Sequence, residues 1–466
     1  MIAYLIASIL IAAAAFAVRR ERHLFHLGVL FYAAQAAFAG AILFGGLYGQ
    51  ESTGWFRFDA PGTLFYVLLC IVSAFAYFHS EAYLRDNDLA QTRAYSALVM
   101  LLTTAITGAY FASNLAVTWI FLEATTLCSA GIIYHRRTAQ TLEAAWKYVF
   151  VCSTGIAMAY LGILLLASAT ECESLDYAAV AAAAPHGNAL YLKIAFLLIL
   201  SGYSCKMELF PLHTVGIDAN FAAPSPASAL ISTGLVNAGF LAIFRVYRLL
   251  AATEIFPWVR SVLLIVGVLS LAIGALFLRR TNNYKRFLSY STVENMGIAA
   301  IGLGIGGAGV WAAVFHVVCH TFVKSSLSLQ MAVVRQVYNG YRINRIGDYI
   351  HINRVGAVGL LTGMVVLVAF PPSPLFISEL MILRETITGS HWWLVAVLLL
   401  LLCIVIYSFC SRMIRLCYQP NQDELHPSKV DRALSWSALS LLVAAMVLGL
   451  WQPDLLRELI DQIATL

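Results

Sequence analysis

The chain has 466 residues, of which 61% are hydrophobic and only 11% are charged, and its net charge is +5. Soluble globular chains carry about a quarter charged residues, so this composition excludes an ordinary soluble domain and requires lipid to cover much of the surface. The small basic excess fits loops at a membrane surface and predicts no nucleic-acid partner. The nine cysteines are scattered without a CxxC or Cys/His motif, so no metal or other cofactor is predicted.

Apolar stretches long enough to cross a bilayer follow one another along the whole chain. They are residues 2–18, 25–47, 62–80, 93–111, 113–134, 144–168, 189–208, 224–250, 257–279, 286–305, 309–337, 354–370 with its companion half 374–388, 391–416 and 432–451. With 354–388 counted as one interrupted span, the sequence predicts an all-α integral membrane protein of about fourteen transmembrane helices.

Two of these spans contain residues that a continuous helix does not accommodate. The seventh ends in KMELFPLHTVGID at 206–218, and the twelfth contains FPPSPLFISE at 370–379. Proline removes a backbone donor and clashes with the preceding turn, and irregular backbone persists inside a membrane only where protein or a wet cavity surrounds it. Paired interruptions in the two halves of a chain are typical of transporters built from inverted repeats.

The breaks predict four parts of the chain. These are N-terminal helices 1–3 in residues 1–92, a first inverted five-helix repeat in 93–250, a second in 251–416, and a last transmembrane helix in 417–466. Lys and Arg gather in loops that all follow odd-numbered spans, at 19–22, 135–137, 279–286, 335–345 and 412–432. Because cytoplasmic loops are rich in these residues, both termini are expected on the non-cytoplasmic side.

Three ionisable residues stand out inside apolar spans, where each costs about 2.5–3.5 kcal/mol to insert. Glu123 lies in the middle of the fifth span, Lys206 at the break of the seventh, and Glu379 after the prolines of the twelfth. Membrane-embedded charges of this kind usually serve function. The alternatives are a structural ion pair or protonated acid for Glu123, and a helix cap or a side chain reaching the interface for Lys206 and Glu379.

His316, His320 and Lys324 follow one another at four-residue spacing in the eleventh span. They therefore line one face of a helix at steps of about 6 Å. Such a stripe is suited to proton transfer, because histidine titrates near neutral pH and a desolvated lysine changes its proton affinity when a partner moves. A hydrogen-bonded packing seam is the structural alternative.

Other polar residues near span ends have more ordinary interpretations. Lys147 lies four residues after Glu143, at salt-bridge spacing. His213 is either a helix cap or part of a cavity lining. Arg245 near the exit of the eighth span is interpreted as an interfacial anchor. Together, the alternation of acids, lysines and histidines across helices predicts a membrane transporter with a buried ionisable path for protons.

At these residues the chain resembles the antiporter-like membrane subunits of respiratory complex I, energy-converting hydrogenases, formate hydrogenlyase and multisubunit cation/proton antiporters. The resemblance covers about residues 90–416 and is carried by KMELFPLHT at 206–214, AAPSPASAL at 222–230, YSTVENMG at 290–297, HTFVKSSL at 320–327 and ISELMIL at 377–383. The Glu-Asn of the third motif and Asn237 look more like the hydrogenase branch, of the component F type, than complex I.

The resemblance implies an ion path through particular residues. Glu123 and Lys206 would form a Glu–Lys pair, a central relay would pass along the face with His320 and Lys324, and Glu379 would be the exit acid.

Two further positions are carried over by the resemblance. Lys147 matches a basic residue of the family's sixth helix. Asn237 stands where complex I relatives often have lysine, and because asparagine does not ionise, that step would need water or a histidine.

The function expected from this resemblance is that of a proton- (or Na⁺-) translocating subunit of a redox-driven complex in the prokaryotic cytoplasmic (inner) membrane. It would hold no redox centre and no cofactor of its own, and would depend on other antiporter-like membrane subunits and on peripheral hydrogenase-like and iron–sulfur subunits. The alternatives are a subunit of a redox-independent cation/proton antiporter, the membrane partner of an inorganic-carbon uptake system, or a scaffold with a degenerate path.

Overall fold

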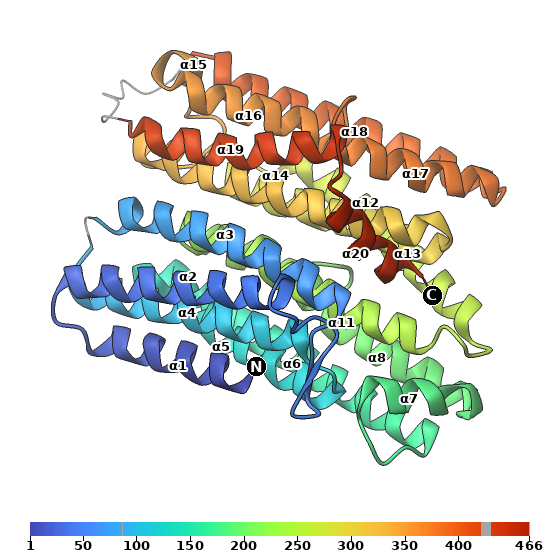
Figure 1. The fold of residues 1–466 in the computed structure, drawn as a ribbon. Helices are drawn as coiled ribbons and strands as arrows, with labels where there is room; N and C mark the ends of the chain where they lie inside the picture. The colour runs from blue at the N-terminus through green and yellow to red at the C-terminus, as the bar shows by residue number, and fades with distance from the viewer. Residues whose placement is uncertain (86, 421–429, 466) are drawn as a thin grey trace. The chain divides into compact units, whose positions relative to one another are not determined.

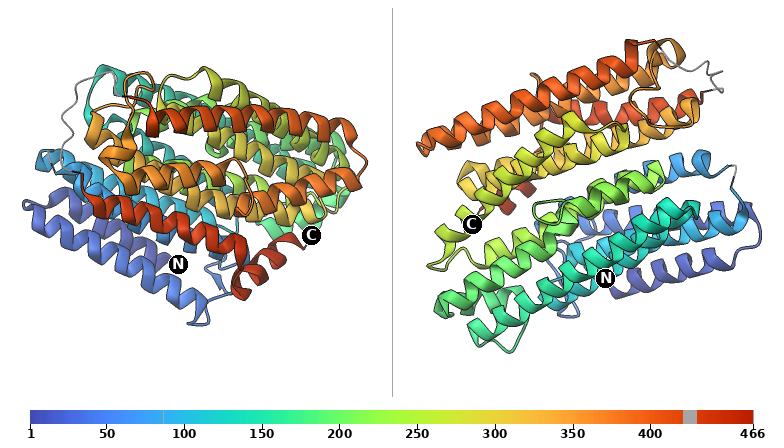
Figure 2. Two further views of the ribbon diagram at one scale, coloured as in Figure 1. Left: turned by 90° about the horizontal axis from the view of Figure 1, so that it is seen from above. Right: turned by 180° about the vertical axis from the view of Figure 1, so that it is seen from behind.

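A computed structural model describes residues 1–85, 87–420 and 430–465. They form two compact units, residues 1–261 with Thr465, and residues 262–464. In each unit long helices lie side by side, as Figures 1 and 2 show. The loop predicted at 412–432 contains 421–429, which lie outside the described residues.

The first unit holds the helices from the N-terminus to the start of α12. They are α1 Ile2–Ala17, α2 Glu21–Leu43, α3 Ala60–Leu84, α4 Leu89–Phe111, α5 Leu115–Ile133, α6 Ala139–Thr170, α7 Tyr177–Ala183, α8 Ala189–Met207, α9 Thr214–Ala222, α10 Ser225–Leu230 and α11 Val236–Leu249, with the short turns η1 Tyr134–Arg136, η2 Ala184–His186 and η3 Ile231–Leu235. A small antiparallel hairpin, β1 Glu51–Ser52 and β2 Phe56–Arg57, precedes α3.

The second unit begins within α12 Phe256–Arg280. Its other helices are α13 Tyr284–Ile305, α14 Ala308–Tyr338, α15 Tyr349–Ile352, α16 Arg354–Leu367, α17 Pro374–Thr388, α18 Trp392–Tyr418, α19 Arg432–Leu450 and α20 Asp454–Ala464. Polar residues start several helices of both units, because their side chains accept hydrogen bonds from the unpaired backbone N–H groups of the first turn. Asn114 does so for α5, Thr138 for α6 and Asn283 for α13.

Eleven helices of the described residues are long and apolar enough to cross a membrane. The predicted count of fourteen is therefore not confirmed, although every predicted span has a helix at its place. The difference has physical causes: α1 and α16 are apolar but shorter than eighteen residues, α17 has fifteen residues, and α13 carries Lys285, Arg286 and Glu294.

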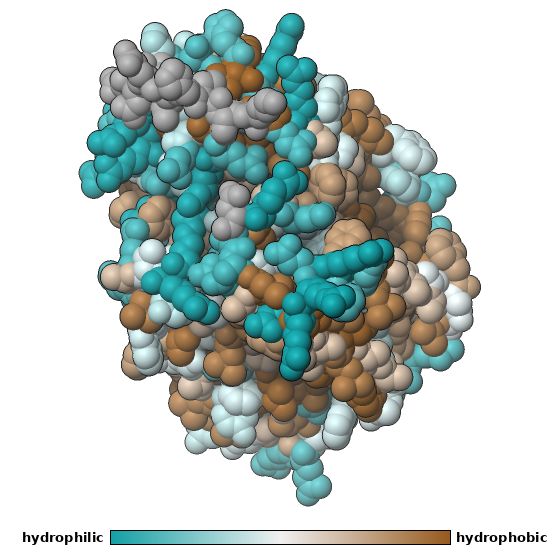
Figure 3. Space-filling view, turned by 90° about the vertical axis from the view of Figure 1, so that its left-hand side faces the viewer, coloured by the Kyte–Doolittle hydropathy of each residue, from teal (hydrophilic) through white to brown (hydrophobic). Residues whose placement is uncertain are grey.

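The helix flanks have the surface that a bilayer requires. Large apolar side chains are exposed along many helices, and Trp392, Trp393 and Trp451 are exposed at the ends of α18 and α19. Tryptophan prefers the boundary between lipid and water, so these positions fit helix ends at a membrane interface. Seen onto one end of the helices, hydrophilic side chains gather there and hydrophobic ones cover the flanks (Figure 3).

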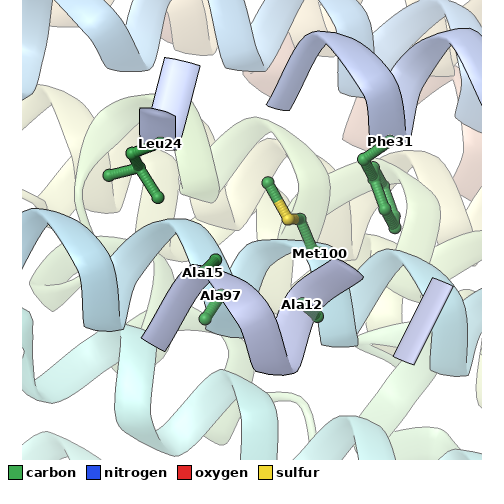
Figure 4. Close-up of a cluster of buried hydrophobic side chains, with 6 residues drawn as sticks. All are labelled: Ala12, Ala15, Leu24, Phe31, Ala97 and Met100. Carbon is green, nitrogen blue, oxygen red and sulfur yellow. The ribbon is translucent and has the colours of Figure 1, made fainter. Parts of the chain in front are cut away.

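Small side chains let the first helices of the chain approach closely. Ala12 and Ala15 of α1, with Ala97 of α4, are fully buried against Leu24 and Phe31 of α2 and Met100 of α4 (Figure 4). Without a hydrophobic driving force between helices in lipid, such close packing is what holds them together. This cluster contains no polar side chain, and it forms part of the packing of the first unit.

Both predicted breaks are present. Helix α8 ends at Met207 and α9 begins at Thr214, while α16 ends at Leu367 and α17 begins at Pro374. Each break contains a non-glycine residue in the left-handed region, Glu208 (φ 57°) and Ala369 (φ 50°). Strained backbone of this kind persists only where the surrounding structure holds it, and it concentrates at functional sites. The proposed inverted symmetry of the two repeats stays a prediction.

Candidate functional site

Lys206 is the central charged residue of the first unit. It lies in the last turn of α8, only 1% exposed. Its ammonium group donates to the hydroxyls of Thr125 (3.1 Å) and Thr126 (2.8 Å) on α5, and to that of Tyr148 (3.5 Å) on α6. The ammonium also lies 5.3 Å from the centre of the Tyr148 ring. Hydroxyls and an aromatic face thus solvate a charge that lipid alone would exclude.

Glu123 is connected to this lysine through a hydroxyl. It is half-buried on α5, and its carboxylate accepts from Ser153 of α6 (2.7 Å) and from Thr126 (3.2 Å). The Thr126 hydroxyl accepts a hydrogen bond from the Lys206 ammonium and donates one to the Glu123 carboxylate. One hydroxyl group therefore connects the two predicted partners. The expected Glu–Lys pair is thus bridged, with no direct ion pair between the two among the described residues.

A second acid of the first unit lies at the break itself. Glu208 follows Lys206 by two residues, is 2% exposed, and accepts from the Asn220 amide of α9 at 2.7 Å. Asn220 in turn accepts from Ser228 of α10 at 2.9 Å. Gly216 makes room for this carboxyl group, since a Cβ there would lie 2.5 Å from the Glu208 Cδ. Glu208 belongs to the interrupted segment 206–218, but no role was predicted for it from the sequence.

His213 and Lys147 are two further sequence-predicted residues of the first unit. His213 is buried immediately before α9, with its ring 6.5 Å from that of Phe210. Lys147 pairs with Glu143, and both side chains are more than half exposed on α6. The structure therefore places Lys147 on an outer face rather than among the buried partners of Lys206.

Asn237 is buried at the start of α11, directly after the π-helical turn η3. A π-turn shifts the backbone hydrogen bonds of a helix and often marks a functional position. The Tyr110 hydroxyl of α4 donates to the Gly234 carbonyl within this turn at 2.7 Å. The predicted eighth span is thus continuous from α10 to α11, with an irregular turn beside the predicted site residue.

Lys324 is the corresponding buried charge of the second unit. It lies on α14, 1% exposed, and donates to the Ser291 hydroxyl of α13 at 2.6 Å and to the Leu288 carbonyl. As with Lys206, a hydroxyl of a neighbouring helix solvates the ammonium group. The two lysines have similar surroundings although they come from different helices of their units.

The two predicted histidines lie on the same helix as Lys324, and both are fully buried. His316 Nδ1 is 2.9 Å from the Ser378 hydroxyl of α17. Neither ring nitrogen of His320 has a hydrogen-bond partner among the described residues. Buried polar atoms without partners are costly, so each calls for a physical explanation.

Glu379 is half-buried on α17, next to Ser378. The contact between Ser378 and His316 therefore brings the predicted exit acid to the helix that carries the stripe. Within the second unit, the predicted residues of α14 and α17 are brought together.

Sequence reasoning missed one buried acid of this unit. Glu294 of α13 is 1% exposed, and its Oε2 accepts from the Asn295 amide at 2.6 Å. The signal was an acid inside an apolar span, the same signal that identified Glu123. From the sequence, Glu294 was interpreted only as part of the motif at 290–297.

This arrangement can hold and transfer protons. Lysine, glutamate and histidine side chains lie inside helices, and hydroxyl groups, which both donate and accept, connect the charged groups of the first unit. The fold and the site define a multi-pass helical membrane protein with ionisable groups inside its helices and a broken helix in each unit.

The chain belongs to the NADH:quinone oxidoreductase/Mrp antiporter transmembrane family, whose model matches residues 112–405. It is 29% identical over 357 residues to a hydrogenase-4 component F homolog of Methylacidiphilum infernorum, an alignment that covers 72% of this chain and 75% of that protein. The resemblance inferred from the sequence motifs is thereby confirmed.

Two solved structures have the same fold. A chain of the membrane-bound sulfane sulfur reductase, an archaeal respiratory membrane complex, matches with a TM-score of 0.88 and 21% identity over 99% of this chain and 96% of that one. A chain of the Mrp complex from a Dietzia species matches with a TM-score of 0.87 and 18% identity over the same shares. One of these complexes is described as respiratory and the other bears the Mrp name, so the fold alone does not separate the two expected functions.

Proposed function

We propose that this chain translocates protons, or Na⁺, as a membrane subunit of a redox-driven complex of the hydrogenase or complex I type. The observation that carries the proposal is the pair of buried lysines, Lys206 and Lys324, each solvated by hydroxyl groups of a neighbouring helix. A lysine inside a membrane is expensive, and its proton affinity responds to the approach or withdrawal of a carboxylate. Two such groups are suited to loading and releasing ions.

In the first unit the proposed path contains the bridged Glu123 and Lys206. Thr126 connects them, so a rotation of its hydroxyl changes how strongly each charged group feels the other. His213 and Asn237 line the proposed path near the break and the π-turn. Lys147, on the outer face of α6, would act at a contact with another subunit or with lipid rather than inside this unit.

In the second unit the proposed path follows α14 and ends on α17. Lys324, His320 and His316 occupy successive turns of α14, and Ser378 connects the last of them to the turn that carries Glu379. Histidine is suited to such a chain because one ring nitrogen can accept a proton while the other releases one.

The partners proposed for this chain are other antiporter-like membrane subunits and peripheral redox subunits of the hydrogenase-like and iron–sulfur kinds. The similarity to a hydrogenase-4 component F homolog supports this assignment. The similarity to a chain of an Mrp complex supports a second candidate, a redox-independent cation/proton antiporter subunit. Both candidates use the same buried residues and differ in what drives the ions.

One experiment tests the proposal and separates the candidates. The complex is purified through a tag on this chain, its subunits are identified by mass spectrometry, and it is reconstituted into vesicles that contain a pH-sensitive dye. Co-purified hydrogenase-like and iron–sulfur subunits, with proton movement on addition of their electron donor, are expected for the redox-driven complex. Proton movement driven by a Na⁺ gradient, without redox subunits, would instead identify the antiporter. Vesicles that move no protons and take up no radioactive Na⁺ under either condition would contradict both.

A further inference from the structure

Glu294 has the features of a second-unit ion-path residue that neither the sequence prediction nor the family resemblance assigned. It is 1% exposed in the middle of α13, inside a chain that spans a membrane. Only one of its carboxyl oxygens, Oε2, has a hydrogen-bond partner among the described residues, and that partner is the neighbouring Asn295. A buried carboxyl group held this loosely costs stability, and such a cost is usually retained for function.

Helix α13 packs on both α12 and α14, and the backbone and Cβ of Glu294 lie against α12, where a Cβ at Gly274 would be 2.6 Å from the Glu294 Cβ. The contacts of α13 with α14 set the heights of the groups on these two helices. A Cβ at Gly302 of α13 would lie 3.0 Å from the Ala313 Cβ of α14, and the Lys324 ammonium bonds Ser291 at 2.6 Å. From the first contact to the second, the position on α13 falls by eleven residues, from 302 to 291, and the position on α14 rises by eleven, from 313 to 324. The two helices therefore run antiparallel in one constant register.

This register sets the heights of the charged groups along the two helices. Glu294 lies one turn beyond Ser291, and His320 lies one turn before Lys324, which puts the acid and the histidine about level. Both are buried, and each has polar atoms without partners: Oε1 of Glu294 and both ring nitrogens of His320. Two proton-carrying groups therefore lie at one height on neighbouring helices, one turn from a buried lysine.

Helix α17 brings a third element to these groups. It packs against both α13 and α14. A Cβ at Gly302 would lie 3.1 Å from the Ile382 Cδ1 of α17, and the Ser378 hydroxyl of α17 is hydrogen-bonded to His316. Measured along the axis of α13, Glu379 is therefore displaced from Glu294 by about 8 Å.

We propose that Glu294 is a proton-carrying residue of the second unit, placed between Lys324 and Glu379. This inference rests on the proposed function and names a further residue of the same path. The buried Glu294 and the half-buried Glu379, with Lys324 on one side and His320 level with Glu294, give a sequence of short transfers in place of one long transfer from Lys324 to Glu379.

The transfers balance in protons and charge. The Lys324 ammonium releases a proton to the Glu294 carboxylate, so an N–H bond breaks, an O–H bond forms, and a charged pair becomes a neutral pair. The Glu294 carboxyl group then passes its proton to one ring nitrogen of His320, which releases a proton from the other nitrogen towards the Glu379 carboxylate. Neutral intermediates lower the cost of moving charge through a buried region.

The test compares three variants in the whole purified complex reconstituted into vesicles. Glu294→Gln keeps the size of the side chain and an oxygen that accepts from Asn295 but carries no proton. Glu294→Asp keeps the carboxyl group, and Lys324→Ala reports on the path itself. Assembly is checked by co-purification of the partner subunits, and the initial rate of proton movement is measured with the electron donor or the Na⁺ gradient that drives the wild type.

We expect the Gln variant to lose about a hundredfold in rate, as for removal of a proton-transfer group, with assembly intact. The Asp variant should keep a substantial part of the wild-type rate. A Gln variant as fast as wild type, or an Asp variant as slow as Gln, would overturn the role of Glu294, provided that Lys324→Ala is inactive. Wild-type rates in all variants, Lys324→Ala included, would overturn the proposed function itself.

Discussion

Thr126 is a neutral side chain on which the charged groups of the first unit depend. Its oxygen accepts from Lys206 at 2.8 Å while its proton is donated to Glu123 at 3.2 Å. A hydroxyl group performs both functions at once because it has one donor and two acceptor positions. The same small residue on α5 thus holds the lysine in place and transmits the state of the acid to it.

Replacing Thr126 by valine keeps its shape and removes this connection. A hydrogen bond to a charged group contributes about 1.5–3 kcal/mol, so we expect the rate of ion translocation to fall about tenfold to a hundredfold. The initial rate of proton movement in vesicles carrying the whole complex is the measurement. Thr125→Val is the matched control, because Thr125 also bonds Lys206 but has no bond to Glu123. Equal effects of the two variants would argue against the bridge.

Gly216 and Glu208 form a second residue-level test. A Cβ at position 216 would lie 2.5 Å from the Glu208 Cδ, so Gly216→Ala should push the carboxyl group away from Asn220. Loss of that buried hydrogen bond should lower the free energy of unfolding by about 1–3 kcal/mol. Thermal unfolding of the detergent-solubilised complex measures the change. The double variant with Glu208→Gly removes the clash and suits the left-handed backbone, but it also lacks the carboxyl group that bonds Asn220, so it should recover only the part of the loss that comes from the clash. Equal stability of Gly216→Ala and wild type would contradict this account.

At the scale of elements, one arginine joins the ends of several helices. Arg245 of α11 pairs with Asp59, the residue that caps α3, at 3.0 Å. It also donates to the carbonyls of Tyr110 and Ala112 at the end of α4, and its guanidinium lies 5.4 Å from the Tyr177 ring of α7. The sequence interpreted Arg245 as an interfacial anchor, whereas the structure buries it to 9% exposure.

This arginine should matter for stability more than for ion transfer. Removing one partner of a fully buried ion pair costs about 3–5 kcal/mol because the other charge is left unpaired. Asp59 is 27% exposed, so water reduces this cost here. We therefore expect Arg245→Met to lower the unfolding temperature of the chain clearly, and the double variant with Asp59→Asn to lower it less. Arg248→Met, one turn onward and exposed, is the control. If Arg245→Met unfolds at the wild-type temperature, Arg245 is not the connecting residue of these helix ends.

The elements themselves were largely predictable, and the reasons are physical. Long apolar stretches and proline-containing breaks have no other stable arrangement in lipid, so helices and both interruptions occur where the sequence placed them. Polar helices and turns were less visible: the amphipathic α20 and the π-turn η3 have no apolar signature of their own.

The side-chain connections were not predictable. Periodicity places His316, His320 and Lys324 on one face but says nothing of Ser378 or Thr126, which lie on other helices. It also does not separate the exposed Lys147 from the buried Lys206. Glu294 has the same apolar surroundings in the sequence as Glu123, and only the structure shows that it is 1% exposed and packed against Gly274 of α12.

For the whole molecule, the sidedness of the two termini is the test that decides between helix counts. Eleven described helices qualify as membrane spans by length and composition, whereas the sequence predicts about fourteen crossings. An odd number of crossings puts the two termini on opposite sides of the membrane, and an even number puts them on the same side. The basic loops after odd-numbered spans predict that both termini are non-cytoplasmic.

Reporter fusions measure this directly in cells. Alkaline phosphatase, which is active only outside the cytoplasm, and green fluorescent protein, which fluoresces in the cytoplasm, are fused separately to the C-terminal end. They are also fused to a chain truncated after Arg345, in the basic loop that follows α14. We expect phosphatase activity without fluorescence at the C-terminus, and fluorescence without phosphatase activity after Arg345. If the C-terminal fusion fluoresces, the C-terminus is cytoplasmic. An odd number of crossings then separates it from a non-cytoplasmic N-terminus. That result would require α16 and α17 either to cross the membrane separately or not to cross it, since the prediction counts them as one interrupted span.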